Sequence, residues 1–249
     1  MQDIKINDQT PHCSKHVLGD GFLKLESKII NDEYTNFIYN SYDIQNKEKT
    51  EHKINIKNLK EISKENFNIG VVLGASGTGK TTILKNCFNK EINKVTFDNS
   101  KSLISNFNFL NPNDACLLLS SMGLSSVPTW LRPFNLLSNG EKYRAELAYI
   151  VGIAKENEVI LIDEYTSVVD RDVAKAMSNA LQKYIRRTNK RIVLASCHFD
   201  IMEWIMPDFI FTPSDGKIQK KKFGLSQKYN WKYTEQEMKL GRVSKTIII

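Results

Sequence analysis

Residues 74–82 have the types and the spacing needed to hold a phosphate group. They follow a continuous apolar run at residues 69–73 and match the pattern GxxxxGK[ST] in full: Gly74, Ala75, Ser76, Gly77, Thr78, Gly79, Lys80, Thr81 and Thr82. Glycines at this spacing let backbone N–H groups wrap phosphate oxygens at the start of a helix, where the helix dipole also favours negative charge. We expect Lys80 to reach the β- and γ-phosphates of a nucleoside triphosphate and Thr81 to ligate Mg²⁺.

Two adjacent carboxylates, Asp163 and Glu164, follow a second apolar run at residues 159–162. Many strands end in acids, so the pair gains its meaning from its position downstream of the phosphate-binding loop. One carboxylate at such a strand end can hold the Mg²⁺ shell, and the next can orient or deprotonate the attacking water. The sequence therefore predicts Asp163 as a metal ligand and Glu164 as a catalytic base.

Between these motifs lies a segment with two interpretations: Leu137, Ser138, Asn139, Gly140 and Glu141. In the first, Ser138 is an ordinary helix N-cap, and Glu141 completes a capping box. In the second, the serine and glycine at the start of a helix form another anion site. The segment resembles the LSGGQ signature of ABC ATPases, which meets the γ-phosphate held by the opposite subunit.

Two later segments also resemble ABC motifs: residues 167–170 the D-loop, and Ser196, Cys197 and His198 the switch-histidine loop. A lone histidine is more often structural, but His198 follows an apolar run where ABC proteins place a γ-phosphate sensor. Five motifs in the family's order span residues 74–198, and the chain is identified as a member of the ABC class. The resemblance implies ATP and Mg²⁺ as cofactors, ATP hydrolysis, and a homodimer closed around two ATP molecules. It assigns Ser138, Asn139, Gly140, Glu141 and Asp170 to the nucleotide site and Glu164, His198 and Lys80 to catalysis.

The elements that must position these residues follow from hydrophobic patterning. Apolar runs at residues 69–73, 159–162, 192–195 and 209–211 are typical of strands buried on both faces of a parallel sheet. A helix is predicted after the N-cap Asp170, with an apolar face listed here: Val173, Ala176, Met177, Ala180, Leu181, Tyr184 and Ile185. Another is predicted from about residue 113 to a stop at Gly123. Residues 22–57, including the β-rich 37–39, favour an antiparallel β layer.

Together with the resemblance to the ABC class, these patterns predict an α/β fold, a P-loop NTPase of ABC type. We expect a mainly parallel core sheet, an antiparallel β layer and a small helical subdomain. The expected divisions are a polar arm at 1–20, the ATPase domain at 21–215 with the helical subdomain at about 101–150, and a basic segment at 216–249.

The charge of the chain is concentrated at its C-terminal end. The formal charge is +7, and residues 216–249 carry nine basic and two acidic side chains, so this basic tail accounts for all of it. Tyr229, Trp231 and Tyr233 alternate with Lys228 and Lys232, a pattern that suits phosphate contact with base stacking, or a solvated edge strand guarded by lysines. With no signal sequence and no long apolar run, we expect a cytoplasmic protein without membrane insertion of its own.

Two departures from the ABC pattern affect the expected site. No glutamine occurs between Thr82 and Leu137, so the Q-loop ligand of Mg²⁺ needs a stand-in, for which Asp98 or Asn99 is the candidate. Asn139 replaces the second signature glycine, which makes slow turnover plausible. Segments around 130–148 and 163–204 also resemble a soluble group of ABC ATPases from phages and mobile elements, some of them joined to acetyltransferase-like domains.

Three functional hypotheses follow from these features. The first is a dimeric ATP-driven machine acting on DNA, RNA or a nucleoprotein, or on an unidentified protein partner. The second is the nucleotide-binding subunit of a membrane transporter, which the missing glutamine and the short segment at about 101–133 argue against. The third is a slowly hydrolysing switch that closes on ATP.

Overall fold

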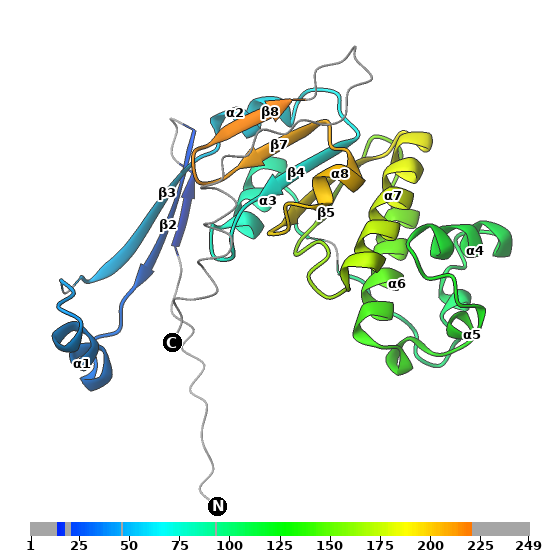
Figure 1. Cartoon of the computed structure of the whole chain (residues 1–249), viewed down its shortest axis with the longest axis horizontal. Helices are drawn as coiled ribbons and strands as arrows, with labels where there is room; N and C mark the ends of the chain where they lie inside the picture. Colours follow the sequence, from blue (N-terminus) through cyan, green and yellow to red (C-terminus); the bar gives the residue numbers. More distant parts are fainter. Residues whose placement is uncertain (1–13, 18–20, 46, 93, 221–249) are drawn as a thin grey trace, which may run out of the picture. The chain divides into compact units, whose positions relative to one another are not determined.

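The computed structural model describes residues 14–17, 21–45, 47–92 and 94–220. Contacts between Cα atoms divide the chain into two compact units, Met1–Lys57 and Asn58–Ile249, which are described in turn (Figure 1). The aromatic and basic positions 221–249 of the predicted tail lie outside the described residues.

The first unit is a three-stranded antiparallel sheet in the order β1-β2-β3. Its strands are β1 (Ser14–Val17), β2 (Phe22–Lys28) and β3 (Lys49–Asn55). Leu23 pairs with Ile54 in the β2–β3 register, and both side chains are buried. The antiparallel β layer was predicted, whereas β1 falls within the segment expected to be a polar arm.

The connection between β2 and β3 forms a helix where the sequence favoured a strand. Residues 37–39 are β-rich, yet they lie within α1 (Glu33–Ser41). The helix is started by a reciprocal cap: Asp32 Oδ1 accepts from Thr35 N at 2.8 Å, and Thr35 Oγ1 accepts from Asp32 N at 2.8 Å. Two backbone donors that a helix start leaves unpaired are thereby satisfied, which outweighs the modest β preference of three residues.

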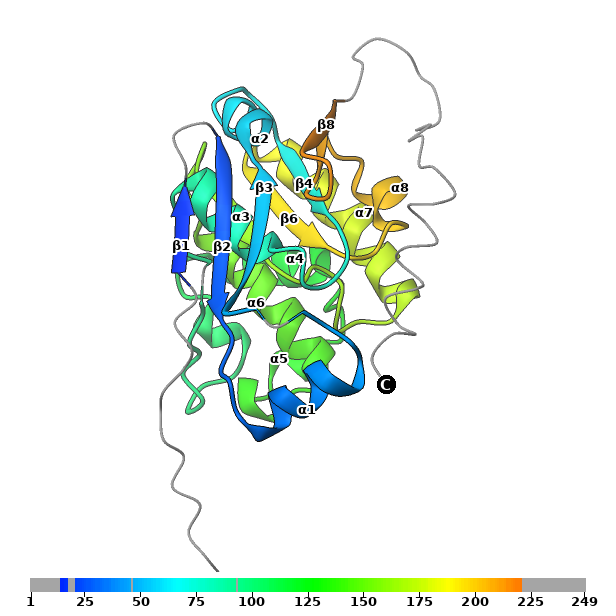
Figure 2. The same ribbon diagram turned by 90° about the vertical axis from the view of Figure 1, so that its left-hand side faces the viewer.

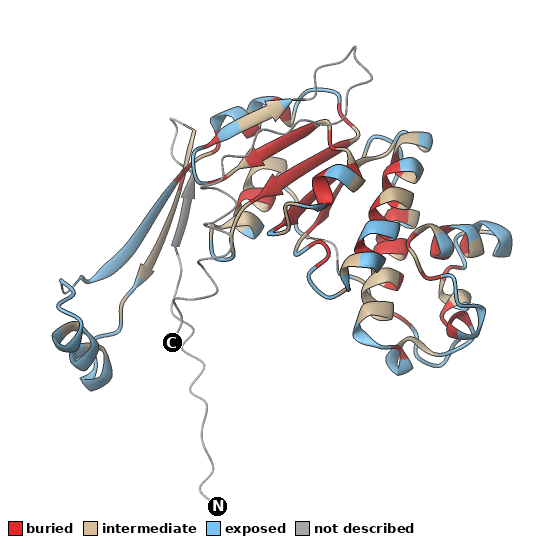
Figure 3. Ribbon diagram, in the orientation of Figure 1, coloured by how far each residue is buried: buried red, intermediate tan, exposed pale blue. Residues whose placement is uncertain are grey.

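The second unit contains a five-stranded sheet in the order β5-β6-β4-β7-β8. Its strands are β4 (Ile69–Leu73), β5 (Val159–Ile162), β6 (Arg191–Ser196), β7 (Phe209–Thr212) and β8 (Lys217–Lys220). The first four in this order run parallel, and β8 pairs antiparallel with β7. All four apolar runs of the sequence are strands, and β4 is buried along its whole length (Figure 3). The predicted α/β class with a mainly parallel sheet is confirmed.

Helices cover both faces of this sheet, as the strand order requires. The chain passes from β4 to β5 through α3 (Lys80–Phe88), and returns to β6 and β7 through α7 (Arg171–Arg187) and α8 (Ile201–Ile205). Because right-handed crossovers in opposite directions leave their helices on opposite faces, α3 lies on one side and α7 with α8 on the other (Figure 2). A short helix, α2 (Lys57–Ile62), precedes β4.

A group of helices lies beyond the β5 edge of the sheet (Figure 1). It comprises η1 (Ile104–Asn106), α4 (Pro112–Ser121), α5 (Val127–Trp130), η2 (Phe134–Leu136) and α6 (Asn139–Ile153). α4 is the helix predicted from about residue 113, and its N-cap is Asn111. The Phe97 ring stacks on the Phe134 ring with 4.2 Å between ring centres, and it packs against the Tyr149 ring in a T-shaped arrangement with 5.3 Å between centres. These contacts join the segment after α3 to this group of helices.

The buried face of α7 differs from the predicted one. Met177, Leu181 and Ile185 are buried as expected, whereas Ala176 is exposed. The buried face also includes three residues that were not predicted to lie on it: Ala174, Ser178 and Gln182. Ser178 is buried because its hydroxyl lies 2.9 Å from that of the buried Tyr165. A paired polar group can lie on a core face, which hydrophobic periodicity does not reveal.

Candidate active site

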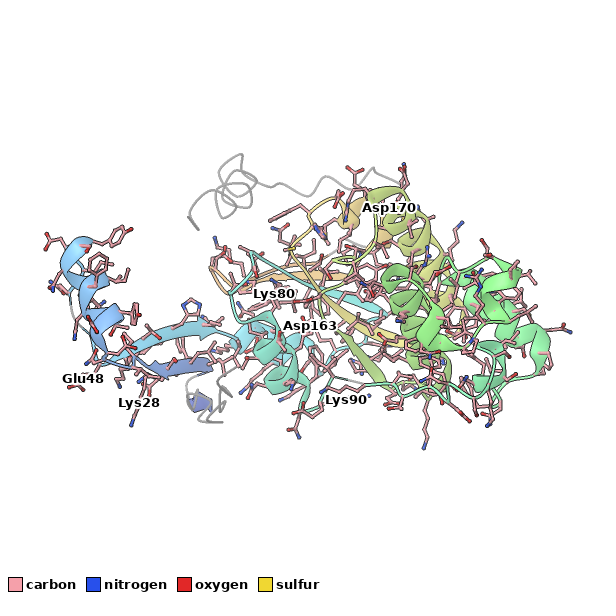
Figure 4. The ribbon with its side chains drawn as sticks, turned by 90° about the horizontal axis from the view of Figure 1, so that it is seen from below. Lys28, Glu48, Lys80, Lys90, Asp163 and Asp170 are labelled. Atoms are coloured by element: carbon pink, nitrogen blue, oxygen red, sulfur yellow. The ribbon has the colours of Figure 1, made fainter. Side chains whose placement is uncertain are left out.

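Three neighbouring parallel strands bring the predicted functional residues to one edge of the sheet. β4 leads into residues 74–79, β6 next to it leads to His198, and β5 beyond β6 leads to Asp163 and Glu164. The carboxyl ends of parallel strands lie at the same edge, where α/β proteins bind ligands. Lys80 and Asp163 lie close together there, and Asp170 lies at the start of α7 (Figure 4).

The loop 74–79 has the backbone geometry of an anion cradle. Gly77 and Gly79 have φ values of 81° and 80°, and a Cβ at Gly77 would meet no atom within 4 Å, so glycine is favoured there by conformation and not by space. Gly79 is also the N-cap of α3 and has no side chain to satisfy the free N–H groups of the first turn. These donors and the helix dipole are available to phosphate oxygens.

Lys80 lies across the loop that precedes it. Its Nζ donates to the carbonyl oxygens of Gly74 at 2.8 Å and Ala75 at 2.7 Å. Burial lowers the pKa of Lys80, whereas the neighbouring carboxylates of Asp163 and Glu164 oppose that shift. The ammonium group is therefore held among carbonyl acceptors at the carboxyl end of β4, close to any ligand bound in the loop.

Thr81 and Asp163 form a pair of oxygen donors. Thr81 Oγ1 donates to Asp163 Oδ2 at 2.5 Å, which links the first turn of α3 to the end of β5. A hydroxyl and a carboxylate are ligands that Mg²⁺ accepts, and Mg²⁺ in nucleotide sites usually takes few protein ligands beside phosphates and water. No cluster of three or more His, Cys, Asp or Glu ligands occurs in the part of the chain that the structure describes. The pair fits Mg²⁺ held together with a nucleotide.

Glu164 and Thr166 both adopt a left-handed backbone conformation. Their φ values are 49° and 69°. Tyr165 lies between them, and its backbone N donates a hydrogen bond to Ala195 O of β6 at 2.8 Å. The Glu164 side chain is exposed at the strand edge, whereas Thr166 is completely buried. The tight turn thus presents the carboxylate outward and the threonine inward.

His198 is positioned by contacts that sequence reasoning did not identify. Its Nδ1 lies 3.0 Å from Thr166 Oγ1, and its backbone N donates to Ser196 Oγ at 3.1 Å. Arg171 reaches Thr166 Oγ1 at 3.5 Å and forms a bidentate ion pair with Asp200. Nothing in the spacing of these residues indicates that they meet, because Thr166 and Arg171 come from the segment that leads from β5 into α7, whereas His198 and Asp200 come from the connection between β6 and α8.

A cavity of about 240 Å³ lies beside the two carboxylates. Asp163, Glu164 and Val168 line it together with Tyr143 and Glu146 of α6. Burial raises the pKa of Glu146 and of Tyr143, and the Tyr143 hydroxyl accepts from Thr166 N at 3.3 Å. α6 thereby contacts the segment that carries Glu164.

The segment 137–141 forms the predicted capping box. Ser138 Oγ accepts from Glu141 N at 3.4 Å. Glu141 Oε2 accepts from Ser138 N at 2.9 Å and from Ser138 Oγ at 2.8 Å, and these two bonds to the carboxylate lower the pKa of Glu141. A Cβ at Gly140 would lie 3.5 Å from Val168 O, so this helix start packs against residues 168–169. Within the described part of the chain, no hydrogen bond or ion pair joins residues 138–141 to residues 74–82.

Asp98 and Asp170 use their carboxylates in local structure. Asp98 accepts from Ser100 N at 3.0 Å and Ser100 Oγ at 2.6 Å and pairs with Lys101, and these interactions lower the pKa of Asp98 to about 2. Asp170 caps α7 by accepting from Val173 N at 2.9 Å. Asn99, the other candidate for the missing glutamine, accepts from Asn135 N at 3.0 Å.

Several solved structures resemble the fold of this chain. One is the dimeric structure of a post-hydrolysis state of the ATP-binding cassette MJ0796 bound to ADP and Pi, at 18% identity and a TM-score of 0.49, covering 64% of this chain and 88% of that chain. A second is a dimeric structure of MJ0796, a bacterial ABC transporter cassette, at 15% identity and a TM-score of 0.47, with the same coverage of both chains. A third is CbiO1 from Clostridium perfringens, part of the ABC transporter complex CbiONQ. It has 17% identity and a TM-score of 0.48, covering 71% of this chain and 87% of that chain. No protein-family model matches the sequence, and neither does any curated protein.

In the described residues, no helix is both long enough and apolar enough to span a bilayer.

Proposed function

We propose that this chain is an ABC-type ATPase that binds ATP with Mg²⁺ and hydrolyses it to ADP and phosphate. The observation that carries the proposal is the convergence of Lys80, Asp163 with Glu164, and His198 at the ends of three adjacent strands. An anion cradle, a cation, a pair of oxygen ligands and an exposed carboxylate are the parts that phosphoryl transfer to water requires.

The chemistry assigned to each residue follows from its place in the site. Residues 74–82 hold the β- and γ-phosphates, and Lys80 exchanges its two loop carbonyls for phosphate oxygens. Thr81 and Asp163 hold Mg²⁺, which neutralises phosphate charge when bound. Glu164 accepts a proton from water as the water oxygen bonds to the γ-phosphorus and the bond to the β–γ bridging oxygen breaks. His198 contacts the γ-phosphate.

We further propose that the active form is a homodimer with shared sites. Ser138 and Asn139 are exposed at the start of the fifteen-residue helix α6, where the N–H groups that the capping box leaves unpaired favour an anion. In this proposal they and Gly140, Glu141 and Asp170 complete the nucleotide site of a second copy. Asp98 would take the place of the Q-loop glutamine as a ligand of Mg²⁺, in exchange for its ion pair with Lys101.

The proposed target is a nucleic acid or a nucleoprotein, bound through the basic tail. Two of the nine basic residues lie in β8, where Lys217 pairs with Asp215 and Lys220 with Glu65. Both pairs are at the surface, and surface pairs are weak enough to exchange for phosphate. The other seven lie outside the described residues.

The first experiment measures ATP binding and steady-state hydrolysis in the wild-type chain and in Lys80→Ala. We expect the variant to lose ATP binding, because the phosphates lose their main cation. Lys183→Ala removes an exposed lysine of α7 as a matched control and should behave as wild type. Wild-type ATP affinity in Lys80→Ala would overturn the assignment of the loop.

The same assay identifies the kind of target. Turnover is measured with and without single-stranded DNA, duplex DNA, RNA and lipid vesicles. Stimulation by nucleic acid supports the proposed target, stimulation only by membranes supports the transporter subunit, and ATP binding with very slow turnover under all conditions supports the switch. EDTA should abolish hydrolysis in each case.

A further inference from the structure

The Thr166 hydroxyl is a buried polar group at the centre of the candidate site. Thr166 is 0% exposed and has a φ of 69°, a conformation that a β-branched residue rarely adopts. Its Oγ1 lies 3.0 Å from His198 Nδ1 and 3.5 Å from an Arg171 guanidinium nitrogen. These are its side-chain partners among the described residues. An unfavourable backbone conformation therefore places one hydroxyl between a histidine and an arginine.

The two partners of the hydroxyl determine the direction of its hydrogen bond. Arginine can only donate, so Thr166 Oγ1 accepts from Arg171. The Thr166 hydrogen then needs an acceptor, because a buried O–H without one forfeits its hydration without replacement. His198 Nδ1 is the atom within reach that can accept. If Nδ1 carried the proton instead, both neighbours would donate to Oγ1, and the Thr166 hydrogen would be unpaired.

Arg171 is held in place to act as this donor. Its guanidinium group forms the bidentate ion pair with Asp200, including Nε to Oδ2 at 2.9 Å, and its Cζ lies 5.2 Å from the centre of the Trp204 ring. Asp200 precedes α8 and Arg171 begins α7, so the two helices on one face of the sheet are joined here. A bidentate pair and a stacked ring fix the guanidinium plane.

We propose that Thr166 is a positioning residue that fixes the tautomer of His198, with Arg171 setting the direction of the Thr166 hydroxyl. Neutral His198 then carries its proton on Nε2 and accepts at Nδ1. With the proposed function as its premise, this tautomer offers Nε2–H as the donor to a γ-phosphate oxygen. The opposite tautomer would present a lone pair to an anion.

The test is the ¹⁵N spectrum of the histidine side chains in the full chain at about pH 8.5, two units above the ordinary histidine pKa of about 6.5. The His198 signals are assigned by their loss in His198→Gln, because the sequence also contains His12, His16 and His52. We expect an unprotonated Nδ1 and a protonated Nε2 in the wild type. Thr166→Val should mix or reverse the tautomers, and Thr166→Ser should restore the wild-type pattern.

Hydrolysis provides the second measurement. Thr166→Val should lower kcat by about 10- to 100-fold, the range observed when a hydrogen-bond partner that orients a metal-binding histidine is lost. Thr188→Val is the matched control, since its hydroxyl bonds only carbonyl oxygens at the end of α7, and it should leave both measurements unchanged. Circular dichroism verifies that each variant is folded.

A wild-type His198 protonated at Nδ1 would overturn the inference, as would a Thr166→Val variant that keeps both tautomer and kcat. If the wild type hydrolyses no ATP, the proposed function fails, yet the ¹⁵N pattern still decides the tautomer. If Thr166→Val is unfolded, Arg171→Met decides the question, because methionine has no donor for Thr166 Oγ1 and the two tautomers of His198 should then also mix.

Discussion

Among individual residues, Glu164 and Thr166 combine a proposed role in hydrolysis with an unfavourable backbone conformation. Positive φ in residues other than glycine carries a cost of order 1–3 kcal/mol each and persists only where surrounding contacts enforce it. Here Tyr165 supplies those contacts: its N donates to Ala195 O, and its carbonyl accepts from Ser196 Oγ at 3.0 Å. The buried tyrosine thus holds a turn that directs Glu164 outward and Thr166 toward His198.

This geometry leads to a prediction for Glu164→Gln. The amide can still orient water but cannot accept its proton, so ATP binding should persist while kcat falls by about 10²- to 10⁴-fold. An ATP-bound dimer should accumulate and is measured by gel filtration with ATP and Mg²⁺. Glu156→Gln, at an exposed position before β5, is the control. Hydrolysis at the wild-type rate would mean that another group activates the water.

At the scale of elements, β4 is positioned by a close contact that only glycine permits. A Cβ at Gly70 would lie 2.2 Å from Cζ of Phe209, whose ring is buried and held edge-on by Phe67 at 5.0 Å. We expect Gly70→Ala to destabilise the fold by about 1–3 kcal/mol through overpacking. Urea unfolding of Gly70→Ala, Phe209→Leu and the double variant checks this. The double variant should recover part of the loss, and purely additive effects would contradict the clash.

The start of α6 combines a structural role with a proposed functional one, and two substitutions separate them. Ser138→Ala should lower the free energy of unfolding by about 0.5–2 kcal/mol, because Glu141 N loses its acceptor. Ser138→Asn retains an N-cap and should keep nearly wild-type stability. Both should hydrolyse ATP more slowly if the hydroxyl contacts a phosphate of the second copy. Full ATPase activity in Ser138→Asn would mean that Ser138 acts only as the N-cap of α6 and does not contact a phosphate.

For the whole molecule, shared sites predict complementation between defective copies. Ser138→Arg blocks one half of a site and Lys80→Ala the other, so each homodimer should be inactive. A mixture should regain about one working site per heterodimer, measured as ATPase activity against mixing ratio. Heterodimers that form without activity would contradict independent shared sites.

The basic tail gives a prediction based on charge. If four to six of its nine basic residues contact phosphates, the logarithm of affinity for single-stranded nucleic acid should fall with the logarithm of salt at a slope of about −3 to −4. Trp231→Ala should cost about 1–3 kcal/mol of binding free energy and leave the slope nearly unchanged, since stacking releases few ions. Alanine at Lys220, Lys221 and Lys222 should flatten the slope. No salt-sensitive binding at low salt, with ATP and Mg²⁺ present, would rule out the nucleic-acid target.

The sequence by itself determined the parallel strands and the groups at their ends. Continuous apolar runs report burial on both faces, and the glycines and carboxylates that follow them are local patterns. The capping box at Ser138 was also predictable, because its partners lie within one helical turn. The strand predicted at residues 37–39 was wrong, because the prediction rested on the β preference of these three residues and did not consider that Asp32 is an N-cap that starts a helix before them.

The tertiary structure alone decided how His198 is held. Thr166 and Arg171 come from the segment that leads from β5 into α7, and His198 and Asp200 from the connection between β6 and α8, so the hydrogen bonds that join the two segments depend on strand order and helix placement. The same reason explains α7, where the hydroxyl of Tyr165 makes Ser178 part of the buried face. Local propensity and periodicity act over a few residues, whereas these contacts are formed by segments that only the folded sheet brings together.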